Sequence, residues 1–160
     1  MRRALACLGM IAGLAVWSGA AAQDVTFNKA GADPLVMTAD SLKALPRVRV
    51  EVKRQAGAEV YEGPALSYLK REAAIPVGPR AQRDPMRGYL VVRGADGYAV
   101  VLSAAEADKD LHEGAVILAD TLNGAPLPAA PGPWRLVVDG DLRPWRSVRQ
   151  VVTIDYRLAE

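Results

Sequence analysis

The segments YLVVR (89–93), GADG (94–97) and YAVVL (98–102) follow one another directly, and they decide the kind of fold to expect. The outer two are rich in β-branched and aromatic residues, which favour strands. The middle segment contains Asp96-Gly97, a pair typical of the tight turn between two antiparallel strands. We therefore predict a β-hairpin over residues 89–102.

Other segments carry the same kind of signal. Residues 47–53 alternate between charged residues and valine, which places Val48, Val50 and Val52 on one face of a half-exposed strand. Turn pairs such as Asn123-Gly124 separate the later apolar runs. Further strands are predicted at residues 115–122, 134–139 and 151–157.

Helical signals are few and short. A helix is expected over residues 38–45, ending before Pro46, and another over 65–74, with Pro64 in its first turn. Ser103 and Glu106 have the spacing of a capping box, which predicts a third short helix. Because strands outnumber helices and turns join most of them, we predict a single α+β domain. Its sheet should be mixed or mostly antiparallel, with short helices.

The first 22 residues have the pattern of a bacterial secretory signal. Arg2 and Arg3 precede an apolar run over residues 4–17, and small residues follow up to Ala22. A membrane anchor would need an apolar run of about 20 residues. We therefore expect a signal peptide over residues 1–22, a mature domain over 23–160, and a periplasmic or secreted location.

Removing that segment changes the charge and the cysteine content. Arg2 and Arg3 are two of the 20 basic residues, so residues 23–160 contain 18 Lys and Arg against 18 Asp and Glu. A near-neutral domain gives no support to nucleic-acid binding. The only cysteine is Cys7, so the mature domain would have neither a disulfide nor a thiolate metal ligand. No later segment is long and apolar enough to span a membrane.

Two clusters of polar residues are candidates for a site. His112, the only histidine, stands between Asp110 and Glu113, but a lone histidine in a polar loop is usually solvated, and zinc hydrolases usually need two. The densest basic and aromatic cluster comprises Arg143, Trp145, Arg146 and Arg149. It could hold an anionic ligand or the acidic surface of a partner, or it could be a solvated edge with the tryptophan packed inward.

From residue 61 onward, a series of short motifs appears in a characteristic order. They are Tyr61-Glu62-Gly63-Pro64-Ala65-Leu66, Asp96-Gly97-Tyr98, Ile117-Leu118-Ala119, Asn123-Gly124-x-Pro126-Leu127, Gly132-Pro133-x-Arg135-Leu136-Val137-Val138 and Pro144-Trp145-Arg146. In that order they resemble the sulfite-oxidase-type molybdopterin-binding domain, in particular its small exported bacterial versions. The resemblance covers roughly 100 residues.

This resemblance implies a fold with a cleft for a molybdenum–pterin cofactor. Arg135 would lie close to that cleft, where its guanidinium suits a phosphate or sulfate. Asp96 and Tyr98 would lie near it too, with the tyrosine hydroxyl over the cleft. In the plainer alternatives, Arg135 is an exposed strand residue paired with an acid such as Asp139, and Asp96-Gly97-Tyr98 is only a turn.

One departure from the family bears on function. The resemblance implies a cysteine ligand for the metal from the segment that corresponds to residues 48–60, and this segment has none. We therefore expect a non-catalytic binding or accessory module of a redox or signalling system, without a cofactor, whose partner is a periplasmic protein or a small anionic ligand. The alternative is a small molybdopterin-dependent oxidoreductase with a non-cysteine metal site, in which molybdopterin is the cofactor.

Overall fold

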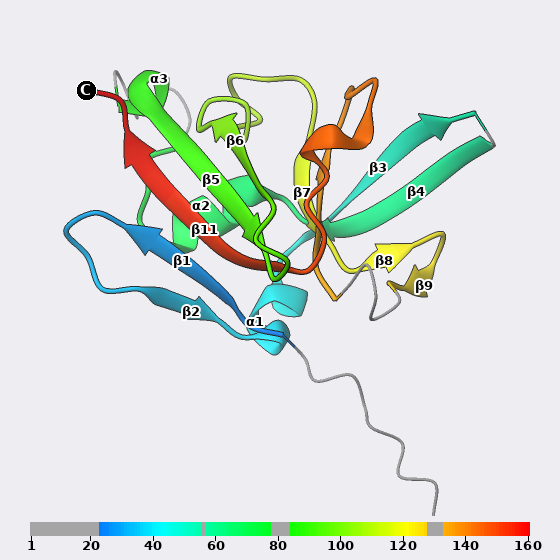
Figure 1. Cartoon of the computed structure of the whole chain (residues 1–160), viewed down its shortest axis with the longest axis horizontal. Helices are drawn as coiled ribbons and strands as arrows, with labels where there is room; N and C mark the ends of the chain where they lie inside the picture. Colours follow the sequence, from blue (N-terminus) through cyan, green and yellow to red (C-terminus); the bar gives the residue numbers. More distant parts are fainter. Residues whose placement is uncertain (1–22, 56, 78–83, 128–132) are drawn as a thin grey trace, which may run out of the picture.

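The computed structural model describes residues 23–55, 57–77, 84–127 and 133–160. In this part of the chain, short helices connect the strands of three β-sheets (Figure 1). The predicted α+β class, with mixed and mostly antiparallel sheets, is confirmed. The expected signal segment lies outside the described residues. Among the described residues, no helix has the length and apolar character needed to span a membrane.

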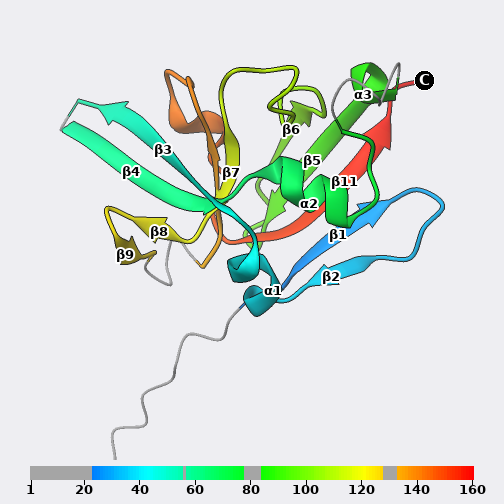
Figure 2. The same ribbon diagram turned by 180° about the vertical axis from the view of Figure 1, so that it is seen from behind.

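The largest sheet joins the two ends of the described chain. Its five strands, in spatial order, are β2 (Leu35–Met37), β1 (Val25–Lys29), β11 (Val151–Leu158), β5 (Gly88–Gly94) and β6 (Ala99–Ser103). β1 and β11 are parallel, and the other neighbours are antiparallel. Phe27, Leu90 and Ile154 point to one face and are buried in the main core. Helix α2 (Leu66–Glu72) packs against this face (Figure 2).

The hairpin predicted over residues 89–102 is formed by β5 and β6. The Gly94 amide donates to the Tyr98 carbonyl at 2.9 Å, which closes the turn. Gly97 has a φ of +82°, a conformation that L-residues with a side chain rarely adopt.

A second, smaller core lies beside the first, between two pairs of strands. β3 (Arg47–Arg54) and β4 (Gly57–Pro64) form a long antiparallel hairpin, which β8 (Thr121–Leu122) and β9 (Ala125–Pro126) extend into a four-stranded sheet. β7 (Val116–Ala119) pairs with β10 (Arg135–Val138). The side chains of Val50, Tyr61 and Val137 meet in the core between these pairs. Val48 and Val52 pack against it, as the alternation in β3 predicted.

Two of the sequence expectations about strands need correction. The single strand predicted over residues 115–122 is divided into β7 and β8, because Asp120 leaves the ladder and its carbonyl accepts from the Leu127 amide at 2.7 Å. β1, β2 and β4 had not been predicted. Each is short or bounded by Gly and Pro, so its apolar residues show no clear alternation.

Helix α1 (Ala39–Ala44) confirms the first predicted helix, and the Thr38 hydroxyl caps it by accepting from the Ser41 amide at 3.2 Å. Pro64 does not lie in the first turn of α2 as expected. It ends β4 instead, and Ala65 is the N-cap residue. A further short helix, α3 (Asp84–Arg87), precedes β5.

The helix predicted after Ser103 is wrong, although its capping hydrogen bonds form. Glu106 accepts from the Ser103 amide, and the Ser103 hydroxyl accepts from Ala105, both at 3.2 Å. The chain then makes turns only. The Ala104 carbonyl, which a helix would use, accepts from the buried Lys70 ammonium at 2.8 Å. The Asp108 amide, which would bond that carbonyl in an α-helix, bonds the Ala105 carbonyl instead.

Candidate functional site

Packing of the β3–β4 hairpin against β10 brings Arg135 next to Tyr61. Tyr61 lies opposite Val50 in the hairpin and is 1% exposed. Arg135 is the first residue of β10, and its side chain points to the same side of that strand as Val137. The two residues are separated by 74 positions, so only the sheet packing joins them.

Hydrogen bonds hold the Arg135 guanidinium in one place. Nη1 donates to the Tyr61 hydroxyl at 2.9 Å, and Nε donates to the Ser147 hydroxyl at 2.8 Å. The Ser147 hydroxyl in turn donates to the Leu136 carbonyl at 2.8 Å. The guanidinium carbon lies 5.1 Å from the centre of the Tyr61 ring. Arg135 is therefore positioned before any ligand arrives.

The end of the β3–β4 hairpin places two charged side chains, Glu59 and Arg54, beside Tyr61. The Tyr61 hydroxyl donates to Glu59 Oε2 at 3.0 Å, and Arg54 Nε donates to the same oxygen at 3.1 Å. Burial alone would raise the pKa of Glu59, but the hydrogen bonds from Arg54 and Tyr61 outweigh it, and the pKa is lowered. Burial raises the pKa of Tyr61, and its hydrogen bond to Glu59 adds to this. The carboxylate is charged and the phenol neutral around neutral pH.

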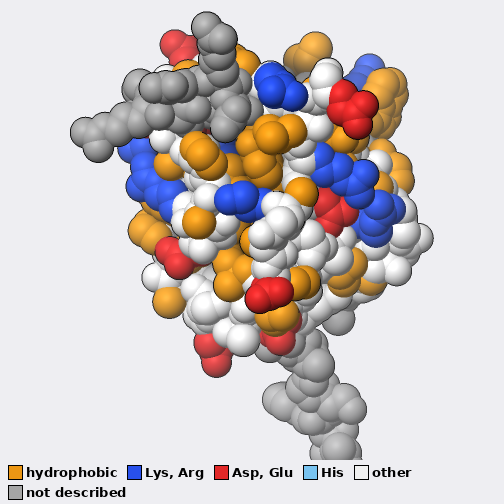
Figure 3. All heavy atoms as spheres, turned by 90° about the vertical axis from the view of Figure 1, so that its left-hand side faces the viewer, with side chains coloured by type: hydrophobic (Ala, Val, Ile, Leu, Met, Phe, Trp, Pro, Cys, Tyr) orange, Lys and Arg blue, Asp and Glu red, His pale blue; other side chains and the backbone are white. Residues whose placement is uncertain are grey.

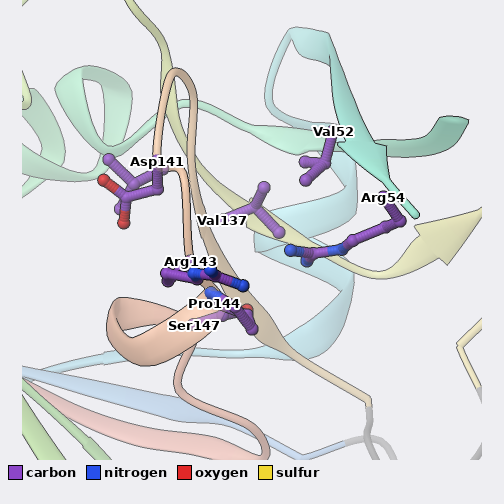
Figure 4. A pocket seen from close by; sticks show the side chains of 8 residues that line it. Val52, Arg54, Val137, Asp141, Arg143, Pro144 and Ser147 are labelled. Carbon is purple, nitrogen blue, oxygen red and sulfur yellow. The ribbon is translucent and has the colours of Figure 1, made fainter.

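Two more arginines complete a group that we call the arginine cluster: Arg54, Arg135, Arg143 and Arg149. Arg149 pairs with Arg135 through an isolated bridge between their backbones. Arg143 and Arg54 line a narrow hollow with a cavity volume of about 10 Å³. The other residues that line it are Val52, Val137, Val138, Asp141, Pro144 and Ser147. Figure 4 shows the side chains of Arg54 and Arg143 reaching toward each other across this hollow.

The electrostatics of the cluster are unbalanced. Burial lowers the pKa of Arg135, and the positive charges of Arg149 and Arg54 lower it further. Glu59 is the carboxylate that bonds within the cluster, through Arg54. Within the described part of the chain, neither Arg143 nor Arg149 forms an ion pair, and both are exposed. Four guanidinium groups thus gather near two carboxylates, Glu59 and Asp141, and Asp141 is paired with Arg146 outside the cluster. The excess of positive charge favours a bound anion.

The opposite end of the molecule has a different character. Figure 3 views the side where β1, β2 and the end of β11 lie, and basic, acidic and apolar side chains are interspersed over it.

The residues that the sequence singled out do not all meet. Asp96 Oδ1 accepts from the Tyr98 amide at 2.9 Å, within the β5–β6 turn. The Tyr98 hydroxyl donates to the Trp145 carbonyl at 2.5 Å instead of pointing at the arginine cluster. Asp96 therefore bonds within the turn, and Tyr98 bonds to the loop that follows β10. Of Asp96, Tyr98 and Arg135, it is Arg135 that lies in the arginine cluster.

The predicted basic and aromatic patch also divides. Arg143 and Arg149 join Arg135, whereas Arg146 donates to Asp141 Oδ1 at 2.5 Å and to Glu106 Oε1 at 2.7 Å. These hydrogen bonds, that to Asp141 first, raise the pKa of Arg146 and neutralise its charge locally. Trp145 does not pack inward, since 75% of it is exposed.

Sequence reasoning missed Arg54, Glu59 and Tyr61 as parts of one site. A signal was present for Arg54, because it continues the alternation that places Val48, Val50 and Val52 on the inner face of β3. Extending that strand by one residue would have pointed it toward the same side. Nothing in the sequence pairs it with Glu59, which reaches it only through the hairpin register.

The donor set around the cluster consists of hard oxygen donors. The segment that corresponds to the family's metal-ligand position forms the β3–β4 hairpin and contains no cysteine. In the described ranges, no group of three or more His, Cys, Asp and Glu side chains is arranged to hold a metal ion. His112 contacts the Gly114 carbonyl at 3.1 Å through Nδ1 and lies away from the cluster.

Comparison with known proteins yields a structural likeness. No family model matches the sequence, and no curated protein matches it. Among solved structures, the fold resembles that of the sulfane dehydrogenase SoxCD from Paracoccus pantotrophus, with a TM-score of 0.62 and 22% sequence identity. The alignment covers 84% of this chain but 38% of that one, so this chain spans well under half the length of its neighbour. The likeness shows that this chain and part of that protein share a fold.

Proposed function

We propose that this chain is an exported, non-catalytic binding module that holds a small oxyanion in the arginine cluster. The observation that carries the proposal is the gathering of Arg54, Arg135, Arg143 and Arg149. Glu59 is bonded within this group, and Asp141, which also lines the hollow, is paired with Arg146. Each guanidinium offers a planar set of N–H donors, which matches the oxygens of a phosphate or sulfate.

The arrangement favours an anion for an electrostatic reason. Bringing Arg149 and Arg54 close to a half-buried Arg135 costs free energy, because like charges repel more strongly where water is excluded. A bound oxyanion would offset this cost and would use donors that Arg143 and Arg149 leave without a carboxylate. Arg135 needs little rearrangement, since Tyr61 and Ser147 already fix its orientation.

The residues fit one part of a molybdopterin and not the other. The arginines suit the phosphate of a pterin cofactor. The metal requires a soft sulfur donor in the family that the motifs resemble, and the nearby oxygen donors of Glu59, Tyr61 and Ser147 are hard and already hydrogen-bonded. We therefore derive no redox step at this site.

A small molybdopterin-dependent oxidoreductase remains the second candidate, because the arginine cluster suits a pterin phosphate. Elemental analysis and pterin fluorescence, on protein exported in a molybdate-supplied host, separate the two. Our proposal predicts neither metal nor pterin in near-stoichiometric amount. Both present together would establish the oxidoreductase instead.

Binding itself is tested by calorimetric titration with inorganic phosphate at constant ionic strength. We expect saturable binding to the exported protein and a loss of affinity of about tenfold or more in Arg135→Ala and in Arg143→Ala. Arg143 forms no hydrogen bond or ion pair among the described residues, so its variant should fold normally. Arg71→Ala, an exposed arginine at the end of α2, is the matched control and should bind like the parent. Equal affinities in all four proteins would refute the site.

A further inference from the structure

The two hydroxyl groups that bond Arg135 have no hydrogen left for a ligand. The Tyr61 hydroxyl donates its hydrogen to Glu59 Oε2 at 3.0 Å, and the Ser147 hydroxyl donates to the Leu136 carbonyl at 2.8 Å. A hydroxyl group has one hydrogen to donate, and each of these two accepts from Arg135 as well. An anion in the arginine cluster can therefore receive hydrogen bonds from guanidinium groups but not from these hydroxyls.

The two arginines closest to Glu59 keep part of their guanidinium groups available. Arg54 uses Nε to bond Glu59 at 3.1 Å, and neither of its Nη atoms forms a hydrogen bond within the described residues. Arg135 uses Nε and Nη1, and its Nη2 forms no hydrogen bond in that same part of the chain. The charges of both arginines act on the Glu59 carboxylate. An anion held between Arg54 and Arg135 would therefore lie beside Glu59.

Glu59 has one carboxylate oxygen to offer such an anion. Its hydrogen bonds with Arg54 and Tyr61 both go to Oε2, and Oε1 accepts none from the described residues. The side chain is 36% exposed, so a ligand can reach it. Burial favours the neutral acid, but these two hydrogen bonds outweigh it and lower the pKa of Glu59. The carboxylate is therefore ionised near neutral pH, and Oε1 can accept a hydrogen bond but cannot donate one.

An ionised carboxylate beside the anion distinguishes oxyanions that carry a hydrogen from those that do not. Hydrogen phosphate and sulfate are both tetrahedral, and at about pH 8 each has a charge of about −2. Hydrogen phosphate has a P–OH group that can donate to Glu59 Oε1 while its other oxygens accept from the guanidinium groups. Sulfate has no hydrogen, so its oxygens would meet the carboxylate as like charges. A site arranged to bond a ligand hydroxyl strongly rejects the analogue that lacks it.

We propose that Glu59 makes the arginine cluster selective for protonated oxyanions, so that it binds hydrogen phosphate in preference to sulfate. This inference rests on the proposed function, in which the cluster binds an oxyanion. The arginines supply the affinity for a negative charge, and they do so for both anions. Glu59 supplies the discrimination, because it accepts from the hydroxyl group of one anion and repels the other.

Calorimetric titration of the exported protein with sodium phosphate and with sodium sulfate tests the selectivity, at about pH 8 and constant ionic strength. We expect phosphate to bind about tenfold or more tightly than sulfate. Glu59→Gln keeps an acceptor for Arg54 and Tyr61 and replaces the negative charge with a neutral amide, so its affinities for the two anions should differ by less than about threefold. Glu51→Gln, which removes the same charge from an exposed position of β3, is the matched control and should keep the preference of the parent.

The titrations separate failure of the selectivity from failure of the anion site. If the parent binds phosphate and sulfate with equal affinity, or prefers sulfate, the selectivity is wrong and the anion site stands. If Glu59→Gln keeps the preference of the parent, Glu59 is not its source and the inference is overturned. If the parent binds neither anion, the proposed function itself fails. The comparison of the two anions on the parent requires no variant, so the inference stays testable even if Glu59→Gln does not fold.

Discussion

The Arg135 guanidinium donates from Nη1 to the Tyr61 hydroxyl at 2.9 Å, and this contact joins the β7–β10 pair to the β3–β4 hairpin. Tyr61 belongs to the second core, and Arg135 belongs to the arginine cluster, so the hydrogen bond connects the two. Tyr61 passes the interaction on to Glu59, which also holds Arg54. The same chain of hydrogen bonds therefore contributes to packing and orients two of the four arginines.

Removing the Tyr61 hydroxyl should weaken the fold more than the site. Tyr61→Phe leaves the buried ring in place and deletes the hydrogen bonds to Glu59 and Arg135. We expect the free energy of unfolding to fall by about 1–2 kcal/mol, measured by urea denaturation. Phosphate affinity should change less than about threefold, because all four guanidinium groups remain. A variant as stable as the parent would show that these bonds contribute nothing to folding.

Glycine at position 63 should be essential to the crossing of β4 over β7. A Cβ there would lie 2.1 Å from the Leu118 carbonyl oxygen and 2.7 Å from the Ala119 Cα, both backbone atoms. Gly63→Ala should therefore cost about 3 kcal/mol or more of unfolding free energy, since backbone must move. Gly31→Ala is the control: its φ of +75° is strained for alanine, but no atom lies within 4 Å, so it should cost about 1 kcal/mol. Similar losses in both would contradict the close approach.

A contact can be predicted from the sequence when its residues are close together in the chain, and not when they are far apart. The β5–β6 hairpin and the alternation of β3 depend on neighbouring residues, and both were predictable. The bond between Arg135 and Tyr61 depends on which strands pack together, which no local pattern encodes. Arg146 illustrates both cases, because it pairs with Asp141 in its own loop and with Glu106, 40 positions away, which no local pattern indicates.

Buried Lys70 should make stability depend on alkaline pH. Burial lowers its pKa below the ordinary value of 10.5, and the charge of Asp108, 3.8 Å away, opposes this only in part. The unfolded chain therefore holds this proton more tightly. Between the lowered pKa and 10.5, unfolding takes up a proton, so the stability contributed by Lys70 rises as pH rises.

Lys70→Met tests that sign. The variant should lack this rise when urea unfolding is compared at about pH 7, 8.5 and 10, and it should lose about 1–3 kcal/mol at neutral pH, because the Ala104 carbonyl loses its donor. Lys43→Met, which removes an exposed lysine from the last turn of α1, should keep the pH dependence of the parent. Identical pH profiles in the parent and Lys70→Met would contradict the account.

The expected signal peptide leads to a prediction about processing. Trp134 is fully buried, and its indole Nε1 donates to the Gln23 carbonyl at 2.6 Å, so the first described residue is tied to the core. Cleavage after Ala22 would leave this contact intact. Intact-mass spectrometry of protein exported from a bacterial host should give a chain that begins at Gln23. A mass that includes residues 1–22 would contradict the expected signal peptide.

The most direct test of the central claim is an NMR titration of the arginine Nε–H signals with inorganic phosphate, at an ionic strength held constant with chloride. The signals of Arg135 and Arg54 can be assigned from their loss in Arg135→Lys and Arg54→Lys. The account predicts that both shift progressively and saturate together, while the signal of Arg71 stays in place. If no arginine signal of the cluster moves beyond what chloride alone produces, the cluster does not bind an oxyanion and the proposed function is wrong.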